Sequence, residues 1–296
     1  MTAHVATGNP EPSTAHEETD MTSIDAPLRP TPEALRAADT PNATGPRPAR
    51  RFAAVLRSEW IKCHTVWATK VLLAVAAVAG LAISWATAAF STGPVLTAAE
   101  VFVYPTLLTA VLAAVAGILL FTSEVQHGTL AVTLAAHPSR WGVVAAKTVL
   151  AAAIGVVLGS VGMSAGFLGA QIGGLDVGDT SGLAATVMWA LLYTVGAGLF
   201  GLGVGMVVRH SAGAVSGLLV WWLVVEGLVV SFAPAGLVRF VPFDAGARTL
   251  DIATDLDRPE VVAAALPNPL HALIFWSYVA AAVALGAVML RRRDVD

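Results

Sequence analysis

The feature that most constrains this chain is a series of long apolar runs. A bilayer core about 30 Å thick needs roughly 20 apolar residues in one helix. Only 12% of the 296 residues are charged, against about a quarter in soluble domains. The sequence therefore predicts an all-α polytopic membrane protein with six transmembrane helices. The expected spans are Trp67–Phe90, Glu100–Phe121, Trp141–Ala170, Leu183–Val208, Gly213–Phe232 and Leu270–Leu290.

The first 46 residues differ from the rest of the chain. They are rich in Ala, Thr, Pro and acidic residues and contain few large apolar side chains. A segment of this kind cannot bury enough apolar surface to offset its ordering entropy. We therefore expect residues 1–46 to form a disordered extension, ahead of a membrane region that spans residues 67–296.

Residues 47–66 have the pattern of an amphipathic helix that lies along the membrane surface. At 100° per residue, one face collects the apolar side chains of Phe52, Val55, Leu56, Trp60 and Cys63. This segment and its flank carry six basic residues: Arg47, Arg50, Arg51, Arg57, Lys62 and Lys70. Glu59 falls inside the apolar stripe. It either snorkels or pairs with a nearby Arg, or it forms a fixed ion pair with a cytoplasmic loop.

The distribution of Lys and Arg predicts the orientation of the spans. Besides the basic N-terminal flank, one side holds Arg140, Lys147, Arg209, Arg291, Arg292 and Arg293. The short connections on the other side, residues 91–99 and 171–182, contain no Lys or Arg. The connection 233–269 holds Arg239, Arg248 and Arg258, but it is long and also holds five acids. We therefore expect both termini and residues 122–142 in the cytoplasm, and residues 233–269 as an outer loop.

The chain lacks the sequence motifs of an enzyme with its own nucleotide or metal site. None of its lysines, Lys62, Lys70 and Lys147, follows a glycine, so no P-loop exists. No H-E-x-x-H motif occurs, and Cys63 is the only cysteine. We expect no catalytic residue, no metal site, no cofactor and no nucleic-acid partner.

Glu226 is the one acidic residue well inside a predicted span. A charged side chain at mid-bilayer costs about 2.5–3.5 kcal/mol on insertion scales. Glu226 lies six residues before Phe232, about 9 Å from the outer end by helical rise. It can reach outer water or pair with Arg239. It is either a structural acid or a residue of the translocation path or gate, and the adjacent Trp221 and Trp222 are interface anchors or line a cavity.

Glycines recur at four-residue spacing within the apolar runs. In lipid, small residues at this spacing let helices approach closely. Packing within the bundle and a dedicated dimer face are both consistent with the pattern, and packing is the simpler interpretation. The pairs are Gly155–Gly159, Gly162–Gly166, Gly201–Gly205 and Gly213–Gly217.

The stretch TSEVQHGTLAVTLAAHPSRWG, residues 122–142, is unusually polar for a short connection between two spans. Gly128 can break the helical path, and Pro138 blocks its continuation. Between them, Leu130, Val132 and Leu134 supply apolar anchors. We expect short helical pieces that lie across a membrane face and dock into a groove of a soluble partner.

Two blocks of the sequence resemble the permease subunits of type-2 ABC transporters, a class that includes many actinobacterial drug-efflux permeases. LRSEWIK, residues 56–62, is similar to the connecting helix ahead of the first span, in which Glu59, Trp60 and Lys62 match. TSEVQHGTLAVTLAAHPSRWGVVAAK, residues 122–147, is similar to the segment that contacts a separate ATPase subunit. The matching positions are Glu124, His127, Gly128, Thr129, Pro138 and Arg140. Val125 and Gln126 replace the usual aromatic and basic residues.

This resemblance implies a permease subunit of an ATP-driven exporter in the plasma membrane. ATP and Mg²⁺ would be bound by the partner ATPase and not by this chain. The permease would act as a homodimer or heterodimer, and its apolar interior suits hydrophobic or amphiphilic small molecules.

Two other functions stay open as alternatives. An intramembrane serine protease would need a Ser and a His on different spans, and Ser164 and His271 are formally available. Ser164 matches G-x-S-x-G but lies in mid-helix rather than at a strand-to-helix turn. A proton-coupled secondary carrier would be expected to hold several intramembrane ionisable residues and repeated halves, whereas only Glu226 stands out.

Overall fold

The computed structural model describes Ala53, residues 56–58, 60–61, 67–91, 96–136, 140–252 and 258–292. The chain divides into two units, residues 1–47 and 48–296, and all of the described residues belong to the second. The predicted extension 1–46 therefore lies outside the described residues. So does most of the predicted connecting helix 47–66, although its described residues, including Trp60 and Ile61, are helical.

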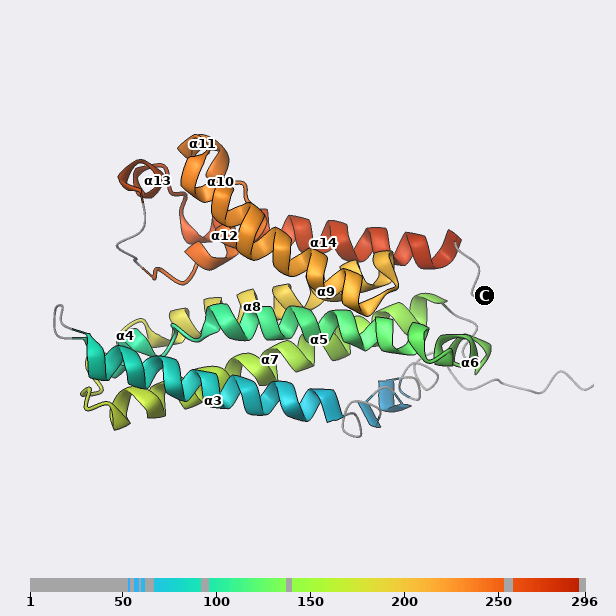
Figure 1. Cartoon of the computed structure of the whole chain (residues 1–296), viewed down its shortest axis with the longest axis horizontal. Coiled ribbons are helices and arrows are strands. Elements are labelled where there is room, and N and C mark those ends of the chain that lie inside the picture. Colours follow the sequence, from blue (N-terminus) through green and yellow to red (C-terminus); the bar gives the residue numbers. More distant parts are fainter. Residues whose placement is uncertain are drawn as a thin grey trace, which may run out of the picture. The chain divides into compact units, whose positions relative to one another are not determined.

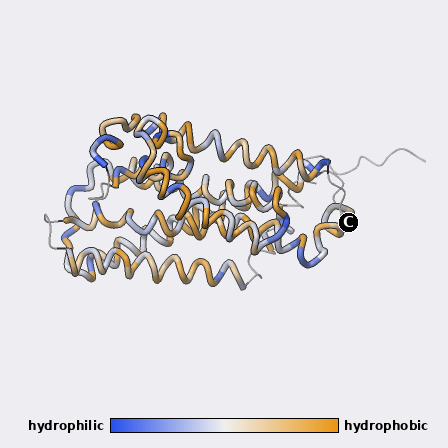
Figure 2. The backbone as a smooth tube through the Cα atoms, turned by 45° about the horizontal axis from the view of Figure 1, so that its top comes forward, coloured by the Kyte–Doolittle hydropathy of each residue, from blue (hydrophilic) through white to orange (hydrophobic). Residues whose placement is uncertain are grey.

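Six helical segments of the described residues are long and apolar enough to cross a membrane. In Figure 1 they run along one another, except for residues 211–232, which cross the others obliquely. The prediction of an all-α protein with six spans is thereby confirmed. Hydrophilic segments gather near the ends of the bundle (Figure 2). The spans are α3 (Trp67–Phe90), α4 (Ala98–Val101) with α5 (Thr106–Gln126), α7 (Arg140–Ile172), α8 (Leu183–Val208), α9 to α10 (Ser211–Phe232) and α14 (Asn268–Arg292).

The second span differs from the prediction at both ends. It begins with the short helix α4, and Pro105 stands at the N-cap of the main helix α5. At its other end α5 continues five residues beyond Phe121, to Gln126. The hydroxyl groups of Thr122 and Ser123 donate to carbonyl oxygens one turn earlier, at 3.0 and 2.6 Å. These polar side chains therefore satisfy themselves on the helix and do not end it.

Close helix contacts at glycine build the centre of the bundle. A Cβ atom on Gly201 of α8 would lie 2.0 Å from the carbonyl oxygen of Ala114 in α5. A Cβ atom on Gly155 of α7 would lie 2.8 Å from the Cα atom of Val195 in α8. Packing within the bundle is thus confirmed for these two glycines. Gly217 of α9 differs, because a Cβ atom there would meet no described atom within 4 Å.

The fifth span contains a π-helix. Helix α9 (Ser211–Leu219) passes into η1 (Val220–Glu226) and then into α10 (Gly227–Phe232). A π-helix is rare, and single-turn π segments are frequent at functional sites. The apolar run predicted a span here, but periodicity within an all-apolar stretch could not reveal the change of helix type.

The predicted outer loop 233–269 contains three short helices rather than open loop alone. They are α11 (Ala235–Val238), α12 (Pro242–Arg248) and α13 (Pro259–Ala263). Helix α12 packs against α14, α8 and η1, and its Phe243 is fully buried in the main core. The segment that contains α12 therefore folds back among the spans.

The six spans are not equally enclosed. The share of buried residues in the apolar window is 61% for α8, but only 17% for α3 and 11% for the fifth span. Helices α5, α7 and α8 therefore form the interior. Helix α3 and the span α9 to α10 leave most of their side chains open to lipid or to another chain.

Candidate functional site

The turn between α5 and α6 (Thr129–Ala136) presents a polar surface at one end of the bundle. His127 caps α5, and its N–H donates to the Ser123 carbonyl oxygen at 3.0 Å. Gly128 follows with φ of 67°, the left-handed conformation that ends many helices. The predicted break at Gly128 is thus confirmed. Gln126, His127, Gly128 and Thr129 are all exposed.

One face of helix α6 packs against the rest of the chain, and the other face is exposed. Leu130 is buried, as expected for an apolar anchor. Val132 is 69% exposed, so as an apolar anchor it is open to a group outside this chain. The Thr129 hydroxyl donates to the Glu124 carbonyl oxygen at 3.3 Å and ties α6 to α5. We use the name coupling surface for the exposed residues His127, Gly128, Thr129 and Val132.

Glu124 lies under this surface rather than on it. Its carboxylate is 2.9 Å from the Lys147 ammonium of α7, and the residues are 8% and 1% exposed. Lys147 Nζ also donates to the Leu120 carbonyl oxygen at 3.2 Å. A buried pair of this kind is costly to break, because removal of one partner leaves an uncompensated charge. Glu124 therefore joins the end of α5 to α7.

Arg140 joins a different pair of helices. Its Nη1 atom donates to the carbonyl oxygens of Leu290 and Arg291, at 2.8 and 3.1 Å. A cation at the last turn of a helix interacts favourably with the helix dipole. The start of α7 is thereby fixed to the end of α14, where the Arg291 guanidinium also lies 5.4 Å from the Trp141 ring centroid.

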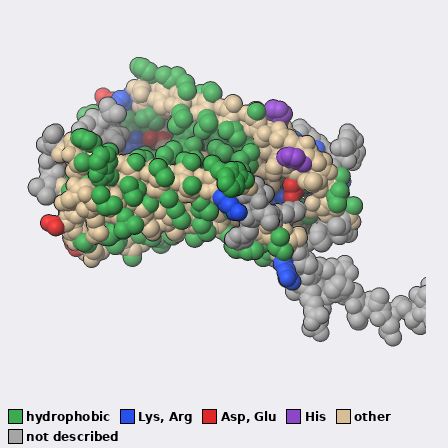
Figure 3. Space-filling model, turned by 60° about the horizontal axis from the view of Figure 1, so that its bottom comes forward, with side chains coloured by type: hydrophobic (Ala, Val, Ile, Leu, Met, Phe, Trp, Pro, Cys, Tyr) green, Lys and Arg blue, Asp and Glu red, His purple; other side chains and the backbone are tan. Residues whose placement is uncertain are grey.

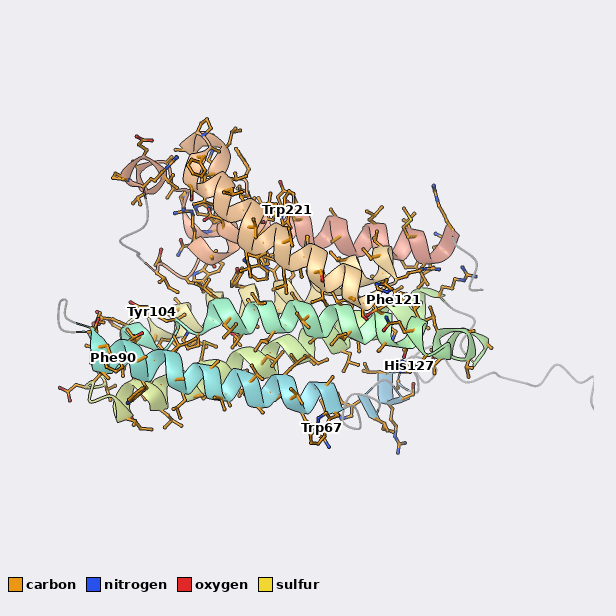
Figure 4. All side chains as sticks on the ribbon, viewed as in Figure 1. Trp67, Phe90, Tyr104, Phe121, His127 and Trp221 are labelled. Atoms are coloured by element: carbon orange, nitrogen blue, oxygen red, sulfur yellow. The ribbon has the colours of Figure 1, made fainter. Side chains whose placement is uncertain are left out.

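The fifth span is tied to the same end of the bundle. The Ser211 hydroxyl donates to Gln126 Oε1 at 2.9 Å, which connects α9 to the end of α5. The His210 side chain accepts from the Gly213 N–H at 3.0 Å and caps α9. Figure 4 shows His127 and Phe121 on this part of α5, beside α6. Four spans, those of α5, α7, α9 and α14, are therefore joined to one another beside the coupling surface.

Three predicted site residues lie outside the described part of the chain. They are Glu59 and Lys62 of the connecting segment and Pro138 of the coupling segment. Trp60 is described and is 48% exposed.

A second polar centre lies toward the opposite end, around Glu226. Trp221 Nε1 donates to Glu226 Oε1 at 2.9 Å. The two residues are five apart, and the i to i+5 hydrogen bonds of η1 bring them onto the same side of the helix. Figure 4 places Trp221 on this segment. Glu226 is almost fully buried.

The Glu226 carboxylate caps helix α12. It accepts hydrogen bonds from the backbone N–H groups of Phe243 and Asp244, each at 3.0 Å to Oε2. Pro242 is the first residue of α12, so these groups are the free donors of its second and third positions. An acceptor at the start of a helix also interacts favourably with its dipole. A side chain of the fifth span thus performs the role usually taken by a local N-cap residue.

Aromatic contacts reinforce this connection. The Trp222 ring stacks on the Phe243 ring with centroids 3.8 Å apart and planes at 8°. The Tyr193 hydroxyl of α8 donates to the Phe243 carbonyl oxygen at 3.3 Å. We use the name outer cluster, after the predicted outer loop 233–269, for Tyr193, Trp222, Glu226 and Phe243. It joins α8, η1 and α12 into one packed unit.

The three arginines of segment 233–269 have partners within the chain. The Arg239 guanidinium lies 5.0 Å from the Phe240 ring centroid, and the pair with Glu226, one of the two alternatives left open by the sequence, is not formed. Arg248 pairs with Asp244 at 2.8 Å.

Arg258 donates to the carbonyl oxygens of Ser231 and Ala233 and so caps the end of α10. Arg248 therefore stabilises α12, and Arg258 stabilises the end of α10.

The structure does not join Ser164 and His271 by a hydrogen bond. Ser164 is exposed on α7. His271 is buried, and its Nε2 accepts from the Leu266 N–H at 3.0 Å. Among the described residues, no group of three His, Cys, Asp or Glu side chains is placed to hold a metal ion.

Sequence reasoning did not single out Lys147, Tyr193 or Phe243 as members of these centres. A signal existed for Lys147: like Lys70 it is a basic residue inside a predicted span, and Glu124 is an acid just beyond the end of the preceding span. No comparable signal existed for Phe243, because its contact with Glu226 depends on how the segment after α10 folds back.

Comparison with known proteins agrees with this architecture. The chain matches the family described as ABC-2 family transporter protein over residues 12–295. A search of curated proteins returned no match. The family match covers all six spans, the coupling surface and the outer cluster. The resemblance to type-2 ABC permeases is confirmed, and the chain belongs to the ABC-2 family of transporter proteins as a membrane-spanning permease subunit.

Proposed function

We propose that this permease couples a separate ATPase subunit to the export of hydrophobic or amphiphilic small molecules across the plasma membrane. It acts as a dimer of permeases with two ATPase subunits, and its termini and α6 face the cytoplasm. The observation that carries the proposal is the coupling surface: an exposed turn and helix whose neighbouring residues join several spans to one another. ATP and Mg²⁺ bind to the partner.

The coupling surface supplies the groups by which a partner can hold the chain. The coupling surface offers the imidazole of His127, the hydroxyl of Thr129 and the exposed side chain of Val132. An apolar anchor surrounded by polar groups is typical of the central residues of protein interfaces. Helix α6 is therefore suited to a groove of a soluble subunit.

Contacts beneath the coupling surface pass a displacement there to the spans. Glu124 and Lys147 join α5 to α7, Arg140 joins α7 to α14, and Gln126 joins α5 to α9. A movement of the α5–α6 turn is therefore passed to several helices together. ATP binding draws the ATPase subunits toward each other, and the permeases that they hold must follow.

At the opposite end of the bundle, the outer cluster links the fifth span to the short helix α12. The outer cluster connects the fifth span to α12 through the Glu226 carboxylate. If the span shifts, the hydrogen bonds at the start of α12 are lost or α12 moves with it. We propose that α12 and Glu226 form the outer gate, with Glu226 as the residue that links the gate to the span.

Site-specific cross-linking tests the docking assignment. In a Cys63→Ser background, Val132→Cys places one thiol on the coupling surface. Gln171→Cys, exposed near the other end of α7, is the matched control. With the cognate ATPase subunit assembled, we expect a thiol cross-linker to join the two chains from position 132 and not from position 171.

One cross-linking result would contradict the assignment of the docking surface. An assembled complex that cross-links from position 171 but not from position 132 would show that the ATPase binds the other end. ATP-dependent uptake of an amphiphilic dye into inside-out vesicles then tests the direction of transport. Uptake that needs both subunits and ATP is the expected result.

A further inference from the structure

A small cavity opens beside the first span, at the end of the bundle that carries α6. It lies between the first turns of α3, helix α7 and Trp60, and has a volume of about 120 Å³. Its wall is mostly apolar, with Leu73 from α3 and Leu150 and Ile154 from α7. Sites for drug-sized ligands enclose roughly 300–1,000 Å³. The cavity is too small for such a ligand and suits part of an aliphatic chain.

Lys70 supplies the one charge among the residues that line this cavity. Its side chain is exposed, and within the described ranges no carboxylate lies in ion-pair distance of it. Lys147 provides the contrast, because its charge is neutralised inside the bundle by Glu124. The charge of Lys70 is thus available to an anion outside the protein.

The position of the cavity matches the boundary between lipid chains and headgroups. Lys70 is the fourth residue of α3, about 5 Å along the helix from its start. Trp60 and Trp67 are 48% and 76% exposed, and Trp is enriched at membrane interfaces. Figure 3 shows Lys and Arg side chains beside a broad hydrophobic face. A chain in the cavity would therefore continue into a headgroup beside Lys70.

We propose that this cavity binds one acyl chain of an anionic phospholipid, whose phosphate pairs with the Lys70 ammonium. The apolar wall accounts for the chain, and the available cation accounts for the headgroup charge. The lipid contacts α3, α7 and Trp60 together, so it fixes the segment ahead of the first span against two spans. This inference does not depend on coupling to an ATPase, and the chain alone tests it.

Retention of lipid by the purified full-length chain is the measurement. The probes are dioleoyl phosphatidylglycerol and dioleoyl phosphatidylcholine, counted by native mass spectrometry after release from micelles. We expect preferential retention of phosphatidylglycerol. Lys70→Gln should reduce that preference about fivefold, the equivalent of about 1 kcal/mol for one cation near a lipid surface. Lys70→Arg should preserve it.

Two further variants separate a built site from general attraction of charges. Arg57→Gln removes an exposed cation that does not line the cavity, and should leave the preference nearly unchanged. Ala153→Phe fills the cavity and should reduce retention of both lipids. Equal effects of Arg57→Gln and Lys70→Gln would overturn the proposal in favour of surface electrostatics.

Inorganic phosphate separates a lipid site from a simple anion site. Millimolar phosphate should not release the bound phosphatidylglycerol, because the chain contributes to binding. Release by phosphate alone would overturn the assignment to a lipid. Thermal unfolding in detergent checks that the variants are folded. If Ala153→Phe is not, the comparison of Lys70→Gln with Arg57→Gln decides the outcome.

Discussion

Glu124 and Glu226 show how two acidic side chains are accommodated in an apolar bundle by different means. Glu124 is paired with a buried ammonium, that of Lys147. Glu226 accepts hydrogen bonds from Trp221 and from two backbone N–H groups at the start of a helix. A buried charge without such partners would cost several kcal/mol. In both cases another helix supplies partners: α7 for Glu124 and α12 for Glu226.

Lys147→Met should destabilise the permease strongly. Loss of one member of a buried ion pair typically costs about 3–5 kcal/mol, whereas replacement of both members by apolar residues is often nearly neutral. We therefore expect Lys147→Met to lower the thermal unfolding midpoint in detergent, and Glu124→Leu combined with it to recover most of the loss. Failure of the double variant to recover would show that the pair does not act as a unit.

Glu226→Ala should destabilise the outer cluster. It removes the acceptor for the free N–H groups of α12, and loss of a helix cap costs about 0.5–2 kcal/mol. Glu260→Ala is the control, because Glu260 is an exposed acid in the first turn of α13. Hydrogen exchange of the α12 amides should increase in the first variant and stay unchanged in the second. Unchanged exchange in both would contradict the capping role.

At the scale of elements, small residues decide which helices form the interior. The contact of α5 with α8 depends on glycines such as Gly201, where even a methyl group would meet the facing backbone. The fifth span has a glycine of the same spacing pattern, Gly217, with no described atom nearby. The same motif therefore marks a tight contact in one span and an open face in another.

Gly201→Ala and Gly217→Ala should have opposite effects. The first forces α5 and α8 apart and should lower the unfolding midpoint, because overpacking typically costs about 1–3 kcal/mol. The second removes helix-interior glycine without a clash and should be neutral or stabilising by up to about 1 kcal/mol. Equal loss in both variants would indicate a partner against Gly217.

Helix α6 should contribute more to ATPase binding than to stability. Val132→Ser removes an exposed apolar side chain and should weaken binding of the cognate ATPase about fivefold or more, if Val132 is a central contact. Val177→Ser, an exposed valine in connection 173–182, is the control. Binding is measured by titration of the ATPase onto permease in nanodiscs. Equal affinity of both variants for the ATPase would exclude Val132 as a contact.

At the scale of the whole molecule, two polar centres stand toward opposite ends of one apolar bundle. The coupling surface is connected to the interior through α5 and α7, and the outer cluster through α8 and the fifth span. The span α9 to α10 is common to both, since Ser211 contacts Gln126 and Glu226 contacts α12. This span is the physical connection through which one centre can influence the other.

Glu226→Gln should separate transport from ATPase binding. The amide keeps the size of the side chain but loses the acceptor strength of a carboxylate, whose hydrogen bonds are worth about 1.5–3 kcal/mol. We expect transport of an amphiphilic dye to fall about tenfold in proteoliposomes, with unchanged affinity for the ATPase. Transport equal to that of the unsubstituted permease would reduce Glu226 to a purely structural acid.

The sequence by itself determined the six spans, because a length of apolar helix that crosses a bilayer can be recognised without knowledge of its neighbours. It also determined the break at Gly128, where the left-handed conformation is a local property of glycine. The identity of the family followed from two short blocks for the same reason, since each block is contiguous.

Only the tertiary structure decided what the polar residues contact. Lys147 meets Glu124, Arg140 meets the end of α14, and Glu226 meets the start of α12, in each case between two different helices. The π-helix of the fifth span and the return of α12 into the bundle are likewise set by packing. Local periodicity carries no information about which helices become neighbours, and in this protein the neighbours determine the environment of every buried charge described above.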